Sequence, residues 1–286
     1  MSSQKSPLVV IIGAGGIGAA IAQRIGSEKL LLLADYSQAV LDAASHSLKE
    51  HGHSIQTHSV DVTDPYSVQT LVDYASSLGP IHTVVHTAGV SPSIATASKI
   101  YSVNLLGAFL VIEAFQKVMA PGSSLLCIAS MAGHLHPMSS ADEEYFAKSP
   151  ASKVLETPSI DTETDSPEKA YGLSKRANIL RAKASANAYG ERGARINSIS
   201  PGIISTELGQ KELSSPHGTF IKQTIEACPA HRVGTAEDIA EAAAFLTGAG
   251  TSFITGTDLL VDGGASGLMM EAIKQHMQQA AANAPL

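Results

Sequence analysis

Tyr171 and Lys175 are the residues whose types and spacing most directly suggest chemistry. Both fall in a predicted helix, Ala170 to Tyr189, where a separation of four positions puts two side chains on one helix face. A phenol has an ordinary pKa of about 10, and a neighbouring ammonium lowers it by stabilising the phenolate. Such a pair can give a proton to a carbonyl oxygen or take one from an alcohol. A tyrosine near a lysine on a helix surface is common, so the pair alone is weak support.

A glycine-rich turn near the start of the chain is a candidate nucleotide-binding element. Gly13, Gly15 and Gly18 match the pattern G-x-G-x-x-G. The turn joins a predicted strand, Leu8 to Ile12, to a predicted helix, Gly18 to Ser27. These glycines permit a tight turn, a close approach of backbone to a pyrophosphate, and close helix packing. The unpaired N–H groups of the helix N terminus attract phosphate. The alternative is a glycine-rich turn with no ligand.

Asp35 ends the second predicted strand, 17 positions after Gly18. A carboxylate in this place accepts hydrogen bonds from the adenosine ribose and repels a 2′-phosphate. No lysine or arginine lies in the glycine turn or directly after Asp35 to offset that repulsion. We therefore expect NAD rather than NADP as the cofactor. The alternative is that Asp35 caps the helix that begins near Ser37.

The elements that must position these residues alternate regularly along the chain. The predicted strands are Leu8–Ile12, Leu30–Ala34, Ile55–Val60, His82–His86, Ser124–Ala129, Arg195–Ile199 and Asp258–Val261. The predicted helices are Gly18–Ser27, Ser37–His51, one that opens at Asp64, Ser98–Met119, Ala170–Tyr189 and Thr235–Leu246. This alternation predicts an α/β fold with a doubly wound parallel sheet of the Rossmann type. The 286 residues fit a single domain, residues 1–286.

Composition narrows the function classes. Hydrophobic residues make up 44% of the chain, which suits a parallel sheet covered by helices. A net charge of −7 argues against a nucleic-acid partner, which needs a basic face. Two cysteines, Cys127 and Cys228, are too few for a disulfide framework. The polar N terminus and the short apolar segment after it indicate neither a signal peptide nor a membrane span. We expect a cytoplasmic protein with no membrane partner.

Further motifs follow in one order, and together they resemble the short-chain dehydrogenase/reductase family from about Leu8 to Gly264. After the glycine turn they are Asp61-Val62, His86-Thr87-Ala88-Gly89, Asn104 in Val103–Gly107, Ser130-Met131-Ala132-Gly133, Tyr171 with Lys175, Ser200-Pro201-Gly202 with Thr206, and Val261-Asp262-Gly263-Gly264. The resemblance implies an oxidoreductase that moves a hydride reversibly between NAD(H) and a small secondary alcohol or ketone, without a metal. It also implies a homotetramer or dimer, in which the helices Ser98–Met119 and Ala170–Tyr189 could pair between subunits.

The resemblance also assigns residue roles. It makes Asn104, Ser130, Tyr171 and Lys175 the catalytic residues. Ser130 would bind the substrate oxygen, Lys175 would bind the nicotinamide ribose and lower the pKa of Tyr171, and Asn104 would hold a water between Lys175 and solvent. The implied cofactor-binding residues are Gly13, Gly15, Gly16, Ile17, Gly18, Asp35, Tyr36, Asp61, Val62, Ala88, Gly89, Tyr171, Lys175, Pro201, Gly202, Ile204 and Thr206. By themselves, Ser130 could equally cap a turn and Asn104 could form a bend.

Two alternative functions stay open. The first is an NADP-dependent carbonyl reductase with the same chemistry. The second is a non-catalytic nucleotide-binding scaffold on the same fold. Tyr171 and Lys175 would be needed for the first function and would have no chemical role in the second.

The sequence departs from the family pattern in three places. The family has three residues between its first two glycines, where this chain has only Ala14. His86-Thr87 replaces two asparagines, so a contact between strands could be changed or lost. Tyr171 follows Ser130 by 41 positions, where the family has about a dozen, so residues 134–169 form an insertion.

Three segments lie outside the regular alternation. The insertion, 134–169, is polar and proline-containing, and we expect an irregular segment that forms a lid or a wall of the substrate site, or else a disordered surface excursion. Its His134 and His136 lack a third ligand at a recognisable spacing, so no metal site is expected. Residues 207–232 are an expected irregular substrate loop, and residues 267–286 an expected C-terminal helical extension.

Overall fold

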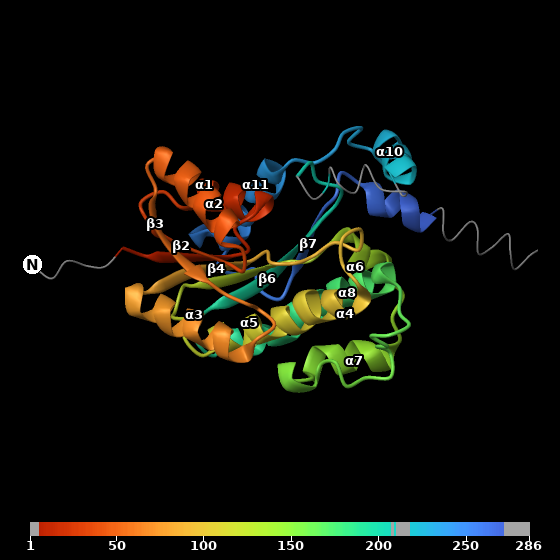
Figure 1. The fold of residues 1–286 in the computed structure, drawn as a ribbon, viewed down its shortest axis with the longest axis horizontal. Helices are drawn as coiled ribbons and strands as arrows, with labels where there is room; N and C mark the ends of the chain where they lie inside the picture. Colours follow the sequence, from red (N-terminus) through yellow and green to blue (C-terminus); the bar gives the residue numbers. More distant parts are fainter. Residues whose placement is uncertain (1–5, 207–208, 210–217, 272–286) are drawn as a thin grey trace, which may run out of the picture.

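The computed structural model describes residues 6–206, 209 and 218–271, which form a seven-stranded parallel sheet between helices (Figure 1). The strands lie in the order β3-β2-β1-β4-β5-β6-β7. Their bounds are β1 (Leu8–Ile12), β2 (Leu30–Asp35), β3 (Ser54–Ser59), β4 (Ile81–His86), β5 (Ser124–Ile128), β6 (Arg195–Pro201) and β7 (Asp258–Val261). The predicted doubly wound parallel sheet is confirmed. The strand order reverses between β1 and β4, where sheets of this kind open a ligand crevice.

Helices cover both faces of the sheet (Figure 1). One layer contains α1 (Gly16–Ile25), α2 (Gln38–Glu50) and α11 (Ala236–Thr247). The other contains α3 (Pro65–Leu78), α5 (Gly107–Gln116) and α8 (Pro167–Gly190). Alternate residues of β1 pack into the two layers, with Val9 and Ile11 facing the first and Leu8, Val10 and Ile12 facing the second. This burial on both sides is why the strands are continuous apolar segments in the sequence.

A continuous helical run from Ala97 to Gln116 contains one π-helical segment. It comprises α4 (Ala97–Ile100), the π-helical η1 (Tyr101–Leu106) and then α5. By length and composition the run could cross a membrane, but 67% of its apolar window is buried inside the protein. That burial is typical of a core helix. The π-helical segment holds Asn104, at a place where such irregularities commonly mark functional sites.

The expectation that the insertion is irregular was wrong. It contains α7 (Ser140–Lys148) and the 3-10 turn η2 (Ala151–Lys153), and its first residues belong to α6 (Met131–Leu135). Ser139 caps α7 by accepting a hydrogen bond from the Asp142 N–H at 3.1 Å. Asp142 and Glu143 lie in the first turn, where acids are favourable. The acidic cluster that suggested a loop is therefore the start of a helix.

The segment 207–232 also contains a helix, α10 (Gly218–Ala227), which the sequence analysis missed. It is short, and the neighbouring Pro216, Gly218 and Pro229 masked its pattern. Residues 207–208 and 210–217 lie outside the described residues, as do 272–286, most of the expected C-terminal extension. Within that extension the described part, up to residue 271, is helical.

The insertion packs against the outer side of α5 and α8, and α7 lies beside α8 in Figure 1. Phe146, Ala151 and Val154 are buried in an apolar cluster with residues of both helices, including Phe109 and Leu173. This cluster is separate from the two that line the sheet. The insertion is thus part of the folded core rather than a surface excursion.

Polar contacts fasten the insertion to the same helices. Arg181 of α8 donates to the Ala147 and Ser149 carbonyl oxygens, both at 3.2 Å. The guanidinium also pairs with Glu113 of α5 at 2.7 Å. Glu113 in turn accepts from the Ala151 N–H at 2.8 Å. One arginine therefore joins α5, α8 and the inserted chain.

Candidate active site

A groove of about 840 Å³ lies over the carboxyl ends of β1, β2 and β4. It is the size of a small-molecule site. The predicted cofactor residues that line it are Gly13, Gly15, Gly16, Ile17, Gly18, Asp35, Tyr36, Asp61, Val62, Ala88, Gly89 and Thr206. The structure therefore brings together residues from five separate segments that the sequence predicted to bind one ligand.

The glycine turn is packed as the fingerprint requires. Gly13 has φ +96°, and a side chain there would lie 2.5 Å from the Ala88 nitrogen. A Cβ at Gly18 would lie 1.9 Å from the Gly13 carbonyl oxygen, so α1 can approach β1 only with glycine here. Gly15, at the N-cap of α1, has open space in front of it and makes no side-chain cap. The N–H groups of this helix end are thus directed into the groove.

Asp35 lies at the groove and is oriented by backbone. Its Oδ2 accepts from the Ala14 N–H at 2.8 Å and its Oδ1 from the Ser37 N–H at 2.9 Å. The cap of α2 is Ser37, which accepts from the Val40 N–H, so Asp35 does not cap that helix. A carboxylate has about four acceptor positions, so Asp35 retains capacity for ribose hydroxyls.

Lys99 also lines this groove, and the sequence analysis missed it. Its side chain comes from α4, which Thr96 caps, and it is exposed. No local motif singles it out, because it is remote in sequence from both the glycine turn and Asp35. Its ammonium is a positive charge on the same groove as the Asp35 carboxylate.

A second cavity of about 130 Å³ adjoins the groove and contains Ser130, Tyr171 and Lys175. It shares Ile17, Thr87, Gly89, Val90 and Thr206 with the groove. The predicted residues Pro201, Gly202 and Ile204 complete its lining on the side of β6. Three of the four predicted catalytic residues therefore face one space beside the candidate cofactor site.

Lys175 is buried between α8 and β5. Its Nζ donates to the Ile128 carbonyl oxygen at 2.9 Å and lies 5.6 Å from the centre of the Tyr171 ring. Burial lowers the pKa of Lys175 to about 8. The ammonium form thus prevails at neutral pH, close enough to the phenol to stabilise a phenolate.

Asn104 lies behind the cavity rather than on it. Its side chain donates to the Val90 carbonyl and accepts from the Val90 N–H, both at 2.8 Å. Its backbone carbonyl accepts from Asn178 Nδ2 at 2.9 Å. A side chain at Gly89 would lie 3.2 Å from Asn104 Oδ1 and 3.7 Å from Lys175 Nζ, so the two predicted residues are close neighbours. In this geometry the Asn104 side chain holds the chain segment after β4.

Ser130 follows β5 directly and caps the short helix α6. Its Oγ accepts from the Ala132 N–H at 3.2 Å. The hydroxyl hydrogen is not used in that contact, so Ser130 can still donate to an oxygen in the cavity. The capping role and the cavity position occur together in one residue.

The two residues that replace the family's asparagines behave differently. Thr87 Oγ1 donates to the Gly13 carbonyl oxygen at 2.5 Å, which ties β4 to the glycine turn of β1. The contact between strands is therefore made by another side chain and is not lost. His86 is fully enclosed, with no partner for Nδ1, and burial together with the charge of Lys175 lowers its pKa to about 3. It is neutral at physiological pH.

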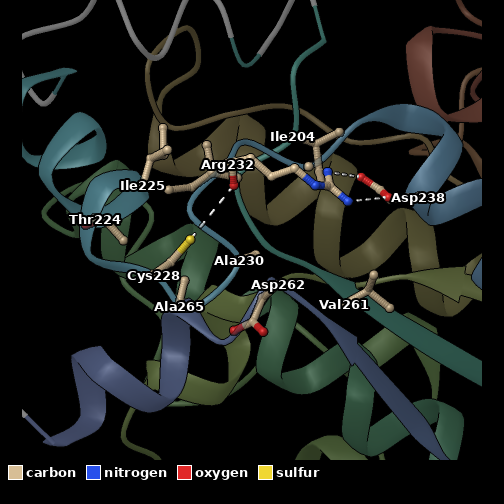
Figure 2. A pocket seen from close by; sticks show the side chains of 13 residues that line it. Ile204, Thr224, Ile225, Cys228, Ala230, Arg232, Asp238, Val261, Asp262 and Ala265 are labelled. Carbon is tan, nitrogen blue, oxygen red and sulfur yellow. Dashed lines mark hydrogen bonds and ion pairs between the residues drawn. The ribbon is translucent and has the colours of Figure 1, made fainter.

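Backbone hydrogen bonds to Gly234 hold the loop that follows β6. Gly234 donates to the Ile203 carbonyl at 3.0 Å and accepts from the Ser205 N–H at 2.8 Å. A cavity of about 160 Å³ lies beyond Ile204, and Figure 2 shows the ion pair of Arg232 and Asp238 at its edge. The pair is 2.6 Å long and holds the pKa of Asp238 at about 2. This cavity contains none of the predicted catalytic residues.

Two expectations about the insertion can be compared with the geometry. Among the described residues that line the cavity at Tyr171, none belongs to 134–169. The lid remains a prediction without a contact to support it. In the part of the chain that the structure describes, no group of three His, Cys, Asp or Glu side chains gathers as for a metal. His134 instead pairs with Asp258, as discussed below.

The chain is similar in sequence to known dehydrogenases and reductases. The sequence model of the short chain dehydrogenases matches residues 7–142, and a model described as enoyl-(acyl carrier protein) reductase matches 138–266. A short-chain dehydrogenase/reductase, bsc3, from Alternaria brassicicola is 38% identical, over 90% of this chain and 94% of that protein. A D-threitol dehydrogenase from Mycolicibacterium smegmatis is 31% identical over 88% of this chain and 89% of its own.

Solved structures agree. Levodione reductase is 25% identical and superposes with a TM-score of 0.74, covering 92% of this chain and 99% of its own. An actinorhodin polyketide ketoreductase variant with NADPH, 22% identical, has the same fold with a TM-score of 0.73 over 93% and 99% of the two chains.

Proposed function

Because the chain belongs to the short-chain dehydrogenase/reductase family of oxidoreductases, we propose that it moves a hydride reversibly between NAD(H) and a secondary alcohol or ketone, with Tyr171 as the proton-transfer residue. The observation that carries the proposal is the cavity that holds Ser130, Tyr171 and Lys175 against the end of the dinucleotide groove. A scaffold without chemistry would not need a buried, mostly charged lysine beside a tyrosine in such a cavity.

The groove residues fit a nicotinamide dinucleotide. The open space at Gly15 and the uncapped N terminus of α1 suit a pyrophosphate. Asp35 suits the adenosine ribose hydroxyls, and Asp61 and Val62 line the groove where the adenine would lie. When bound, the cofactor supplies or accepts the hydride at its nicotinamide ring.

The chain's own residues then handle orientation and the proton. Ser130 donates its hydroxyl hydrogen to the substrate oxygen and stabilises charge that develops there. Tyr171 gives a proton to that oxygen during reduction and takes it back during oxidation. Lys175 stabilises the phenolate through its nearby charge, and Asn104 fixes the segment Gly89–Val90 that borders both spaces.

Two side chains of opposite charge in the groove bear on whether the protein binds NAD or NADP. Asp35 disfavours a 2′-phosphate, which supports NAD. Lys99 lines the same groove and supports the second candidate, an NADP-dependent carbonyl reductase with identical proton chemistry. We favour NAD because Asp35 is held at the ribose end by two backbone N–H groups, whereas Lys99 is exposed and can move away.

The cofactor assignment predicts opposite effects for two charge changes. Asp35→Ala should raise the KM for NAD about tenfold, because it removes the hydrogen bonds to the adenosine ribose. It should also narrow the preference for NAD over NADP, because it removes the repulsion between the carboxylate and the 2′-phosphate. Lys99→Ala should leave the KM for NAD within about twofold. Steady-state kinetics with both cofactors give these values. A preference for NADP in the unchanged protein would overturn the assignment to NAD.

A panel of alcohols and ketones tests the proposed substrate class. D-threitol, a 3β-hydroxysteroid and a cyclic diketone follow from the names of related proteins, and each contains a secondary alcohol or a ketone. Turnover is measured by the appearance or loss of reduced nicotinamide absorbance. We expect at least one secondary alcohol or ketone to be converted. Activity confined to primary alcohols or aldehydes would contradict the proposed substrate class.

A further inference from the structure

Helix α6, which begins after Ser130, is anchored at its other end by a side-chain hydrogen bond that the chemistry above does not use. His134 lies in its last turn, with Nε2 at 2.7 Å from Asp258 Oδ2. Ser198 Oγ donates to the second carboxylate oxygen, Oδ1, at 2.5 Å. The Asp258 side chain is only 8% exposed and Ser198 is fully buried. This carboxylate therefore depends on protein groups for its hydrogen bonds.

This hydrogen bond joins parts of the chain that belong to neighbouring strands at one edge of the sheet. Asp258 begins β7, and its Cα partner in β6 is Ser198, which in turn is paired with Cys127 of β5. The chain leaves β5 and passes through Ser130 directly into α6. His134 thus connects the far end of this helix, across β6, to the edge strand β7.

Another side of α6 lies in close contact with the backbone of α8. A Cβ on Gly133 would lie 2.8 Å from the Arg176 nitrogen and from the Lys175 carbonyl carbon. A Cβ on Gly172 would lie 2.9 Å from His136 Nδ1. The α6 helix is therefore fitted between β7 and the stretch of α8 that carries Tyr171 and Lys175. Because Ser130 caps α6 and Tyr171 lies on α8, a shift of α6 relative to α8 would change the separation of these two residues.

We propose that His134 and Asp258 are positioning residues that hold Ser130 at its distance from Tyr171. This inference rests on the proposed function, in which Ser130 binds the substrate oxygen. His134 does not line the cavity, so it acts only through α6. Removing it leaves a buried carboxylate short of a partner, and the helix shifts to expose or re-pair that group. A misplacement of about 1 Å near reacting atoms can cost up to ~100-fold in rate.

Hydrogen exchange tests the anchor without any substrate. The reporter amides are Ala132, Gly133 and His136, all hydrogen-bonded within the α6 segment. We expect His134→Ala to speed their exchange about tenfold and His134→Gln, which keeps an N–H donor, to restore slow exchange. Ala19 of α1 is the control amide and should not change. Unchanged exchange in His134→Ala, or an equal rise at Ala19, overturns the proposal.

A double-mutant cycle tests whether the anchor acts through Ser130. With the panel compound of highest turnover, His134→Ala should lower kcat about tenfold and leave the KM for NAD unchanged. In a Ser130→Ala background the same change should have no further effect, whereas additive losses overturn the positioning role. Glu143→Gln, which removes the ion pair between Glu143 of α7 and Arg176 of α8, is the matched control and should leave kcat unchanged.

The failures are distinguishable. If Ser130→Ala has no effect on turnover, the proposed role of Ser130 fails, while the exchange data still decide whether His134 anchors α6. Ser130→Ala could instead lose most of its turnover while the α6 amides of His134→Ala exchange as slowly as in the unchanged protein. In that case the proposed function stands, and only the inference that His134 positions Ser130 is wrong.

Discussion

Burial sets the protonation of three groups around the ends of β4 and β5. It lowers the pKa of Lys175 to about 8, raises that of Cys127 to about 12, and, together with the charge of Lys175, lowers that of His86 to about 3. At neutral pH the thiol and the imidazole are therefore uncharged, and Lys175 keeps most of its charge. The field at Tyr171 thus comes from Lys175 without competition from these neighbours.

His86 makes the fold sensitive to acid. The unfolded imidazole takes a proton below its ordinary pKa of about 6.5, but the folded one does so only near 3. Its contribution to stability is thus complete above about pH 6.5 and is lost as the pH falls through this window. We expect a loss of roughly 2 to 3 kcal/mol between pH 7 and 4.5 from this group.

Urea unfolding of the unchanged protein and of His86→Asn at both pH values measures this term. The asparagine does not titrate, so the variant should lose less stability on acidification by that amount. Equal losses in the two proteins would show that His86 is not the group responsible.

At the scale of elements, the insertion and α8 stabilise each other. Phe146 of α7 is fully buried against a cluster with α4, η1, α5 and α8. The Arg181 guanidinium lies 5.2 Å from the centre of the Phe109 ring and binds two carbonyls of the insertion. Because α8 also carries Tyr171 and Lys175, the insertion packs against the helix that holds two of the proposed catalytic residues.

Phe146→Ala should therefore lower the free energy of unfolding by about 3 to 5 kcal/mol, the usual cost of deleting a buried phenyl ring. Phe253→Ala is the matched control, because that ring is fully exposed and its loss should change stability by less than about 0.5 kcal/mol. Denaturant titration compares the two. A cost for Phe146→Ala as small as that for Phe253→Ala would contradict the packing described.

Inner strands such as β1 and β5 could be predicted from sequence because all their residues are buried and form short, largely apolar segments. Leu8–Ile12 and Asp258–Val261 were predicted with the observed bounds. The helices α7 and α10 were missed because they are short and bounded by proline or glycine. The α7 helix is held by tertiary contacts such as that of Phe146, which have no local sequence pattern.

In the candidate site too, local motifs could be predicted from the sequence, whereas contacts between distant residues could not. Tyr171, Ser130 and the glycine turn are local motifs, so their positions could be predicted. The neighbours that tune them are distant in sequence: His134 and Asp258 are 124 positions apart, and Thr87 meets Gly13 from 74 positions away. Lys99 reaches the groove from α4, which packs against α8. Such contacts depend on the assembled fold.

At the scale of the whole molecule, the insertion covers part of the surface that could otherwise contact another subunit. The expected pairing of Ser98–Met119 and Ala170–Tyr189 between subunits remains untested. The middle of α8, residues 170–182, is nevertheless buried or half-buried by the chain's own residues. Exposed side chains lie only towards its two ends, at Glu168 and Lys169 and at Lys183, Ala184 and Asn187. We therefore expect any homo-oligomer to form without a bundle of these helices.

Ala184→Glu tests this expectation, because it places a charge on the exposed part of α8. Light scattering should give the same mass for this variant as for the unchanged protein. Leu260→Glu places the same charge on the edge strand β7 and serves for comparison. An assembly that dissociates in Ala184→Glu but not in Leu260→Glu would contradict the account.

The most direct test of the central claim is the turnover of Tyr171→Phe, with NAD binding measured in parallel. The change removes only the hydroxyl proposed to transfer the proton and leaves the ring packed beside Lys175. We predict that kcat falls at least about 100-fold while the dissociation constant for NAD stays within about twofold. Unchanged turnover of a secondary alcohol or ketone by Tyr171→Phe would show that this residue does not transfer the proton.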